Sequence, residues 1–148
     1  MRQLGSCRSM TLVFVYGTLK RGFPLHELGL SNGLYLGPAR TVLSYPLLVA
    51  RDFYGPMMLD RPGSGLQVTG ELFEVGEDQL PTLDRLEDVG SPGSFRSELE
   101  VEPVGGGLRQ TALGFMKDES WLVPLHSGHL ADYQDRRFVP PWARREIR

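Results

Sequence analysis

Residues 13–22 read VFVYGTLKRG, and they hold the sharpest pattern in the chain. The apolar run that begins at Thr11 and ends at Tyr16 is rich in β-branched and aromatic residues, which predicts a buried strand. A sharp loop then runs from Gly17 to Gly22. A loop at the end of a buried strand can turn several backbone N–H groups toward one point and hold an anion or an oxyanion. On these residues alone, an ordinary exit from strand to loop remains the alternative.

A second pattern lies in an acidic segment that contains regularly spaced leucines. We predict a helix from Glu77 to Asp88, because one apolar stripe recurs at a spacing of three, formed by Leu80, Leu83 and Leu86. Asp84 and Glu87 share one face of such a helix. Since the stripe flanks Glu87, we expect its carboxyl group to be partly buried, with a raised pKa. A solvated acidic helix end remains the alternative.

Short strands separated by turns dominate the rest of the chain. The 148 residues include 18 glycines and 11 prolines, which favours turns and a β-rich fold. We predict a short helix over 24–30, one or two strands over 34–48, strands over 57–59 and 67–75, where Gly70 allows a bulge, and a hairpin of 95–104 with 108–116. The segment 124–132 fits a loop or a short helix. We therefore expect an α+β domain: a small mixed β-barrel or sheet with a few short helices.

Length and composition are those of one globular domain. We assign residues 1–10 to a flexible N-terminal extension and 11–148 to a single domain, long enough to bury a core. A net charge of −2 lacks the electrostatic footprint of a nucleic-acid binder. No run approaches the ~18 apolar residues of a membrane helix. The opening residues lack the apolar core of a secretory signal, so we expect a cytosolic protein.

The sequence provides little for a metal centre. Cys7 is the only cysteine, which excludes a disulfide within the chain and a cysteine-based zinc site. His126 and His129 are spaced like two ligands but have no evident third partner, so we predict no metal site. Solvent exposure is expected for the cations beside the first loop and at the C-terminus: Lys20, Arg21, Arg144, Arg145 and Arg148.

Several further motifs follow VFVYGTLKRG along the chain. They are GFPLH at 22–26, YPL at 45–47, PGSG at 62–65, GELFEV at 70–75, LDRLE at 83–87 and FVP at 138–140. Together they resemble the gamma-glutamylamine cyclotransferases, within the wider gamma-glutamylcyclotransferase and AIG2-like superfamily, from about Leu12 to the C-terminus. Two residues depart from the family pattern, because Phe73 and Phe95 stand where the family has tyrosines.

The resemblance implies a reaction and a set of site residues. In this family the α-amine of a gamma-glutamyl group attacks its own side-chain amide carbonyl, which gives 5-oxoproline and a free amine without a cofactor. The position of Glu87 implies that it is the catalytic acid and base. The implied substrate contacts are the side chain of Tyr16 and the backbone N–H groups of Gly17, Thr18 and Leu19. We expect a monomer with a small-molecule substrate.

The substrate within this class stays open. We expect gamma-glutamyl amines such as L-gamma-glutamyl-ε-L-lysine, because VFVYGTLKRG and GFPLH are closest to the amine branch. Glutathione or gamma-glutamyl amino acids are the alternative substrates. A non-catalytic binding member of the family is a further alternative, which Phe73 and Phe95 make conceivable and which the retained Glu87 argues against.

Overall fold

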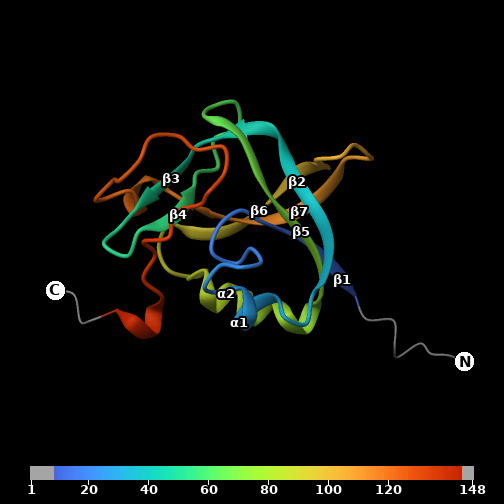
Figure 1. The fold of residues 1–148 in the computed structure, drawn as a ribbon, viewed down its shortest axis with the longest axis horizontal. Coiled ribbons are helices and arrows are strands. Elements are labelled where there is room, and N and C mark those ends of the chain that lie inside the picture. The colour runs from blue at the N-terminus through green and yellow to red at the C-terminus, as the bar shows by residue number, and fades with distance from the viewer. Residues whose placement is uncertain (1–8, 145–148) are drawn as a thin grey trace, which may run out of the picture.

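The computed structural model describes residues 9–144, and strands dominate that range (Figure 1). The strands are β1 (Met10–Val15), β2 (Leu34–Tyr45), β3 (Leu47–Ala50), β4 (Gly55–Met58), β5 (Leu66–Gly76), β6 (Ser94–Pro103) and β7 (Gln110–Lys117). The helices are α1 (His26–Leu30) and α2 (Leu80–Leu86), with 3-10 turns at Glu77–Gln79, Glu119–Trp121 and Pro141–Ala143. The expected α+β class is confirmed.

Five strands close a barrel in the order β1-β5-β2-β6-β7. β1 runs antiparallel to β5, with Val13 opposite Phe73, and meets β7 in parallel at Leu113. β6 and β7 form the expected antiparallel hairpin, in which Ser94 lies opposite Lys117. β3 and β4 form a separate two-stranded sheet beside the barrel (Figure 1). Barrel closure therefore brings the ends of β1 and β7 together although they are far apart in the sequence.

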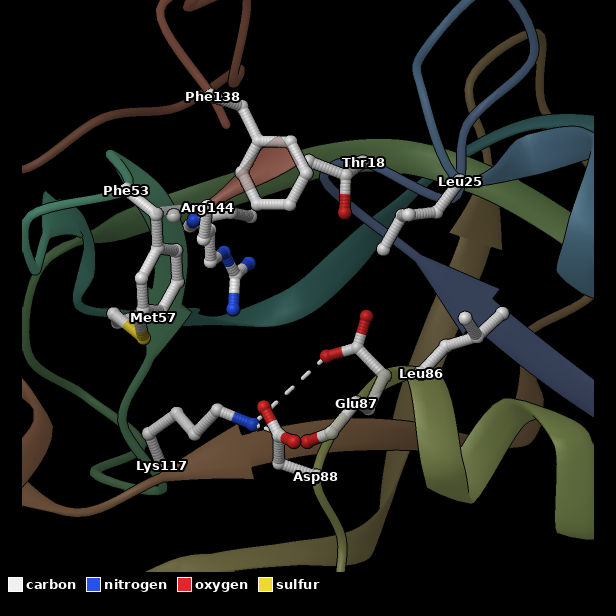
Figure 2. A pocket seen from close by; sticks show the side chains of 12 residues that line it. Thr18, Leu25, Phe53, Met57, Leu86, Glu87, Asp88, Lys117, Phe138 and Arg144 are labelled. Atoms are coloured by element: carbon white, nitrogen blue, oxygen red, sulfur yellow. Dashed lines mark hydrogen bonds and ion pairs between the residues drawn. The ribbon is translucent and has the colours of Figure 1, made fainter. Parts of the chain in front are cut away.

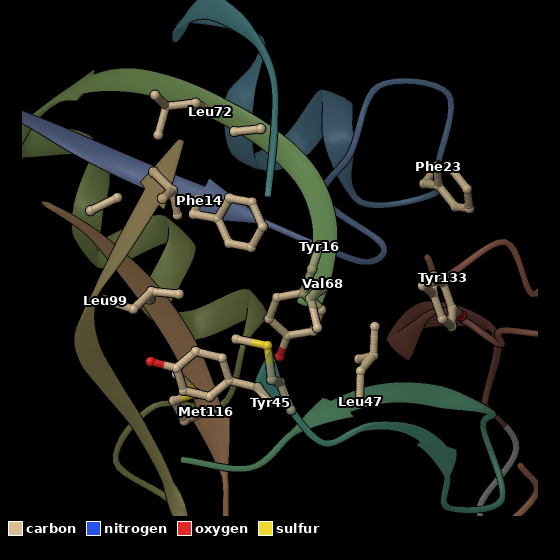
Figure 3. Close-up of a cluster of buried hydrophobic side chains, with 14 of the residues drawn as sticks. Phe14, Tyr16, Phe23, Tyr45, Leu47, Val68, Leu72, Leu99, Met116 and Tyr133 are labelled. Atoms are coloured by element: carbon tan, nitrogen blue, oxygen red, sulfur yellow. The ribbon is translucent and has the colours of Figure 1, made fainter. Parts of the chain in front are cut away.

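The first strand is buried on both faces, which explains its unbroken apolar sequence. Phe14 and Tyr16 belong to the cluster inside the barrel, whereas Val13 and Val15 pack outward against the helices. Figure 3 shows the interior cluster, whose other members include Tyr45, Val68, Leu72, Leu99 and Met116. The outer cluster contains α1 and α2 side chains: Leu30, Leu80, Leu83 and Leu86. The two helices are thus held against the β1 side of the barrel.

The helix expected over 77–88 is shorter than its apolar stripe indicates. A 3-10 turn precedes α2, and Pro81 lies in the first turn, where its missing N–H costs little. α2 ends at Leu86, with Glu87 as its C-cap. Asp88 follows with φ of 60°, a left-handed conformation typical of the residue that ends a helix. Glu87 therefore lies at the end of the helix, and not within it as expected from the sequence.

The irregular strand pairing lies in β2 and not in β5. The prediction that Gly70 allows a bulge is therefore wrong. β2 shifts its register against β5 within residues 35–37 and 40–44. Gly70 pairs regularly with Ala39, and a side chain at Gly70 would meet the carbonyl oxygen of Val15. Glycine is required there because two backbones approach closely, a sequence signal that a bulge shares.

The structure describes neither end of the chain. Of the expected extension, residues 1–8, including Cys7, lie outside the described residues, whereas Met10 already belongs to β1. Arg145 and Arg148 also lie outside them. The segment 124–132 contains no helix. Neither helix within residues 9–144 has the length and apolar character needed to cross a membrane.

Candidate active site

The loop after β1 turns its backbone carbonyls into the protein. The carbonyl oxygens of Gly17 and Thr18 accept backbone N–H groups from later residues of the loop, at 3.0 and 2.9 Å. The carbonyl oxygen of Leu19 lies 3.0 Å from His26 Nδ1, which places the ring proton on Nδ1. Within residues 9–144, no hydrogen bond joins the N–H groups of Gly17, Thr18 and Leu19 to a protein acceptor. These three N–H groups are available to an anion.

Burial makes this loop rigid. Tyr16 Oη donates to the carbonyl oxygen of Phe115 at 2.6 Å, which ties the end of β1 to β7. Burial, followed by the nearby charge of Glu87, raises the pKa of the Tyr16 hydroxyl well above its ordinary value. Gly17 packs directly on the ring of Pro56, which leaves no room for a side chain.

Lys20 corrects one of the sequence expectations. Its side chain is buried, and its ammonium group donates to Asp132 Oδ1 at 3.0 Å and to the carbonyl oxygen of Tyr133 at 2.7 Å. Arg21 is exposed as expected and stacks on the ring of Tyr35. Lys20 therefore fastens the loop to a distant segment and does not face solvent.

Glu87 is held at its backbone as well as at its carboxyl group. Its carbonyl oxygen, freed by the helix end, accepts from Lys117 Nζ at 2.6 Å and from Ser94 Oγ at 2.9 Å. Its carboxyl group is only 15% exposed, and Oε1 lies 3.9 Å from Lys117 Nζ. The Ser94 and Lys117 pair, set by the hairpin register, thus positions the carboxylate.

The surroundings of Glu87 favour the protonated carboxyl group. Burial raises the pKa of Glu87 from 4.5 to about 7; the ammonium group of Lys117 lowers it, and the charge of Asp88 raises it. Burial likewise lowers the pKa of Lys117, against the charges of Glu87 and Asp88. A carboxyl group with a pKa near neutrality can both accept and donate a proton at physiological pH.

Two adjoining cavities meet at Glu87. The inner one is lined by residues of the β1 end and its loop, together with β7: Val15, Tyr16, Gly17, Leu19, Pro56, Glu87 and Phe115. The outer one lies at the surface and is lined among others by Thr18, Phe53, Leu86, Glu87, Asp88, Lys117, Phe138 and Arg144 (Figure 2). All five residues expected at the site from the sequence therefore line one cavity or the other.

The two tyrosine replacements lie outside these cavities. Phe73 is fully buried in the outer apolar cluster, where it packs against Tyr35 and His26. Phe95 is 37% exposed and lines a neighbouring surface groove that also contacts Lys117. Phe95 therefore does not line either cavity at Glu87.

Several residues at the site were missed by the sequence analysis. Lys117 ends the second hairpin strand, and nothing in its neighbourhood marks it as a partner of Glu87. Phe53 comes from the turn between β3 and β4, and Arg144, expected in a solvated tail, lies in the outer cavity. The match of FVP at 138–140 to the family was the one signal for this wall, because Phe138 belongs to it.

Metal ligands are not gathered anywhere in the described residues. Within 9–144, no three His, Cys, Asp or Glu side chains lie close enough to hold a metal ion. His126 instead stacks on Tyr54, with ring centroids 4.1 Å apart, and its Nε2 bonds to the carbonyl oxygen of Arg51 at 2.9 Å.

The fold is a small closed barrel, and its site combines free N–H groups with a carboxyl group whose pKa is close to neutral pH. These features define a class of proteins suited to proton transfer on a small anionic molecule. Residues 13–134 match the family described as Gamma-glutamyl cyclotransferase, AIG2-like, and the chain belongs to that family. The resemblance noted for VFVYGTLKRG and the motifs after it is thus confirmed.

Named relatives lie within the same family. A Gamma-glutamylaminecyclotransferase from Mus musculus is 48% identical over 98 residues, which cover 63% of this chain and 64% of the relative, just under two thirds of its length. One from Bos taurus is 43% identical over 133 residues, 84% of this chain and 76% of the relative. The crystal structure of an AIG2-like protein from Mus musculus has a TM-score of 0.75 at 34% identity and covers 94% of this chain and 99% of that one.

Proposed function

We propose that the protein is a gamma-glutamylamine cyclotransferase that converts gamma-glutamyl amines to 5-oxo-L-proline and a free amine. The observation that carries the proposal is the position of Glu87, whose carboxyl group has a pKa of about 7 and which lines both cavities together with residues of the loop. The names of the relatives from Mus musculus and Bos taurus support the same activity.

The reaction needs two protons to be moved from the α-nitrogen to the leaving nitrogen. The α-nitrogen of the gamma-glutamyl group forms a bond to the side-chain amide carbon, and the bond from that carbon to the leaving nitrogen breaks. Ionised Glu87 takes one proton from the α-ammonium group before attack and a second from the ring nitrogen after it, and passes both in turn to the leaving nitrogen, which departs as an ammonium ion. Nucleophile and electrophile share one molecule, so folding the substrate into the attack geometry is the main task of the enzyme.

The loop supplies the fixed contacts for that geometry. The N–H groups of Gly17, Thr18 and Leu19 bind the α-carboxylate or the oxyanion that develops on the amide carbonyl, a stabilisation that needs no rearrangement in a rigid loop. Tyr16 forms the wall behind them.

A 5-oxoproline release assay on Glu87→Gln tests the assignment. Glutamine keeps the shape and removes the base, so we expect turnover to fall by ~10²–10⁴-fold. Asp84→Asn is the matched control, because Asp84 lies one helical turn away and pairs with Arg96 at 3.3 Å instead of facing the cavity. Near-normal release by folded Glu87→Gln protein would refute the role of Glu87, and no release by the wild-type protein from any gamma-glutamyl compound would favour a non-catalytic binding member.

Gamma-glutamyl-ε-lysine is expected to be a better substrate than glutathione. Both compounds carry the same gamma-glutamyl group, so the leaving side must discriminate. The outer cavity offers Phe53, Leu86 and Phe138 to the apolar four-carbon stem of lysine, and contacts of this kind are worth ~10–200-fold. Comparing kcat/KM for the two compounds at one pH tests this; equal values, or a preference for glutathione, would move the protein to another branch of the family.

We also propose that the protein acts as a monomer in the cytosol on a small molecule alone. The single cysteine is in keeping with a reducing compartment. Light scattering of the purified protein and fractionation of the source cells test the two statements separately.

A further inference from the structure

The C-terminal end of the described chain forms one wall of the outer cavity. The N–H of Val139 donates to the carbonyl oxygen of Phe53 at 2.9 Å, and the rings of Phe53 and Phe138 meet edge to face, 6.1 Å apart. Arg144 follows after a 3-10 turn, and its Nε donates to the carbonyl oxygen of Val139 at 2.8 Å. These contacts fix the backbone and the aromatic side chains of the wall.

Arg144 extends its guanidinium group into this cavity. The group lies 3.8 Å from the ring centroid of Phe53 and 5.6 Å from that of Phe138, and Figure 2 shows it between these rings and Glu87. Two aromatic rings and the bond from Nε hold the plane of the group in place. Its terminal N–H groups are a preorganised fork of the kind that binds a carboxylate.

The charge of Arg144 has no direct partner among the carboxylates of residues 9–144. No Asp or Glu within residues 9–144 forms an ion pair with it. Burial lowers the pKa of the guanidinium, the charge of Asp88 acts against this, and the group stays cationic at neutral pH. A partly buried cation with free N–H groups in a cavity favours an anionic ligand.

The two ends of a substrate contact different groups of the protein. The gamma-glutamyl end contacts the loop N–H groups, and the leaving group extends toward Arg144. Gly17 and Leu19 line the inner cavity and Thr18 lines the outer one, whereas Arg144 lines the outer cavity alone. Glu87 must lie between the α-amine and the leaving nitrogen, so the leaving group extends into the outer cavity, toward Arg144. A carboxylate there belongs to the leaving amine and not to the gamma-glutamyl group.

We propose that Arg144 determines specificity by binding a free carboxylate on the leaving amine, at the end of its apolar stem. This inference rests on the proposed function and narrows its substrate class. Gamma-glutamyl-ε-lysine with a free lysine carboxylate fits, because its stem lies against Phe53 and Phe138 while its carboxylate reaches Arg144. It follows that peptide hydrolysis, which frees the lysine carboxylate, must precede this reaction when the compound comes from cross-linked protein.

Two substrates that differ only in this carboxylate test the proposal. Gamma-glutamyl-cadaverine has the same stem as gamma-glutamyl-ε-lysine and lacks the carboxylate. For Arg144→Gln we expect kcat/KM for the lysine compound to fall roughly tenfold, mainly through KM, since a hydrogen-bonded charge pair at a half-exposed site is worth about that much. The value for the cadaverine compound, which ends in an ammonium group, should not fall. Arg144→Lys should lie between, and Arg109→Gln, an exposed arginine 63% accessible on the far hairpin, is the control.

Direct binding separates this proposal from the proposed function. Calorimetry on Glu87→Gln protein, with and without Arg144→Gln, compares the affinities for the two uncleaved compounds without turnover. A preference for the lysine compound that disappears with Arg144→Gln supports the inference. An equal loss for both compounds, or no loss for either, overturns it while 5-oxoproline release by the wild-type protein leaves the activity standing. A wild-type protein that releases no 5-oxoproline refutes the proposed function instead.

Discussion

Replacing Glu87 with glutamine is expected to stabilise the protein above neutral pH while it removes turnover. The carboxyl group has a pKa of about 7 in the fold, against 4.5 ordinarily, so between these pH values the folded state holds a proton that the unfolded state has lost. The free energy of unfolding of the wild-type protein therefore falls as the pH rises from about 4.5 to about 7, and this contribution is constant above that. Glutamine has no such proton, so the variant lacks the fall.

The magnitude follows from the two pKa values. At about 1.4 kcal/mol per pKa unit they correspond to roughly 3 kcal/mol. This is an upper figure, because the substitution also removes the carboxylate that lies 3.9 Å from the buried ammonium of Lys117. We expect Glu87→Gln to be more stable than the wild-type protein by roughly 1–3 kcal/mol at pH 8 and by close to nothing at pH 4.5.

Urea unfolding at a series of pH values measures this difference directly. Urea titrations of both proteins are carried out at pH values from 4.5 to 8.5. The dependence of the unfolding free energy on urea concentration should be the same for both, so that the midpoints report stability. Asp84→Asn again serves as control, because its carboxylate is paired with Arg96. A stability difference between Glu87→Gln and wild type that does not change with pH would refute the reasoning, since it would mean that Glu87 titrates alike in both states.

Three further substitutions have distinct expected outcomes. Lys117→Met removes the cation that lowers the pKa of Glu87, so the acid limb of kcat/KM should move to higher pH; an unmoved limb would separate the two groups. Gly17→Ala places a methyl group against the ring of Pro56 and shifts the loop, which should reduce turnover by about 100-fold. Circular dichroism should show little change in secondary structure. Tyr16→Phe leaves a buried carbonyl without its donor and should lower the free energy of unfolding by about 1–2 kcal/mol, which thermal unfolding measures.

The elements that carry strong local patterns could be predicted from the sequence. The apolar run 11–16 required a strand buried on both faces, and the glycines at 105–107 required a hairpin turn. The end of α2 could not be placed, because its apolar stripe continues toward Asp88 although that residue adopts a left-handed backbone. Barrel closure was likewise open, since a single parallel contact between β1 and β7 distinguishes a barrel from a sheet.

The site residues likewise divide into those that local sequence patterns predicted and those that they did not. Glu87 and the loop 17–19 were located because each lies beside a local pattern that also matches a family motif. Lys117 reaches the site through the register of the β6–β7 hairpin, and Arg144 reaches it through the aromatic contacts of the C-terminal wall, neither of which a local sequence pattern specifies. Lys20 was misjudged for the same reason, because its partner Asp132 is distant in the chain.

The position of Glu87 makes its ionised carboxylate energetically unfavourable, and the same position suits its role in proton transfer. A carboxylate at a helix C-cap meets the negative end of the helix dipole, and burial adds to that cost. One buried ammonium, at 3.9 Å, offsets the charge only in part. If Lys117 approached as closely as a direct ion pair, the pKa of Glu87 would fall and the carboxylate would be a poor base; without Lys117 the pKa of Glu87 would rise further. The intermediate distance keeps both protonation states accessible near neutral pH, which a single residue needs in order to take a proton from one nitrogen and give it to another.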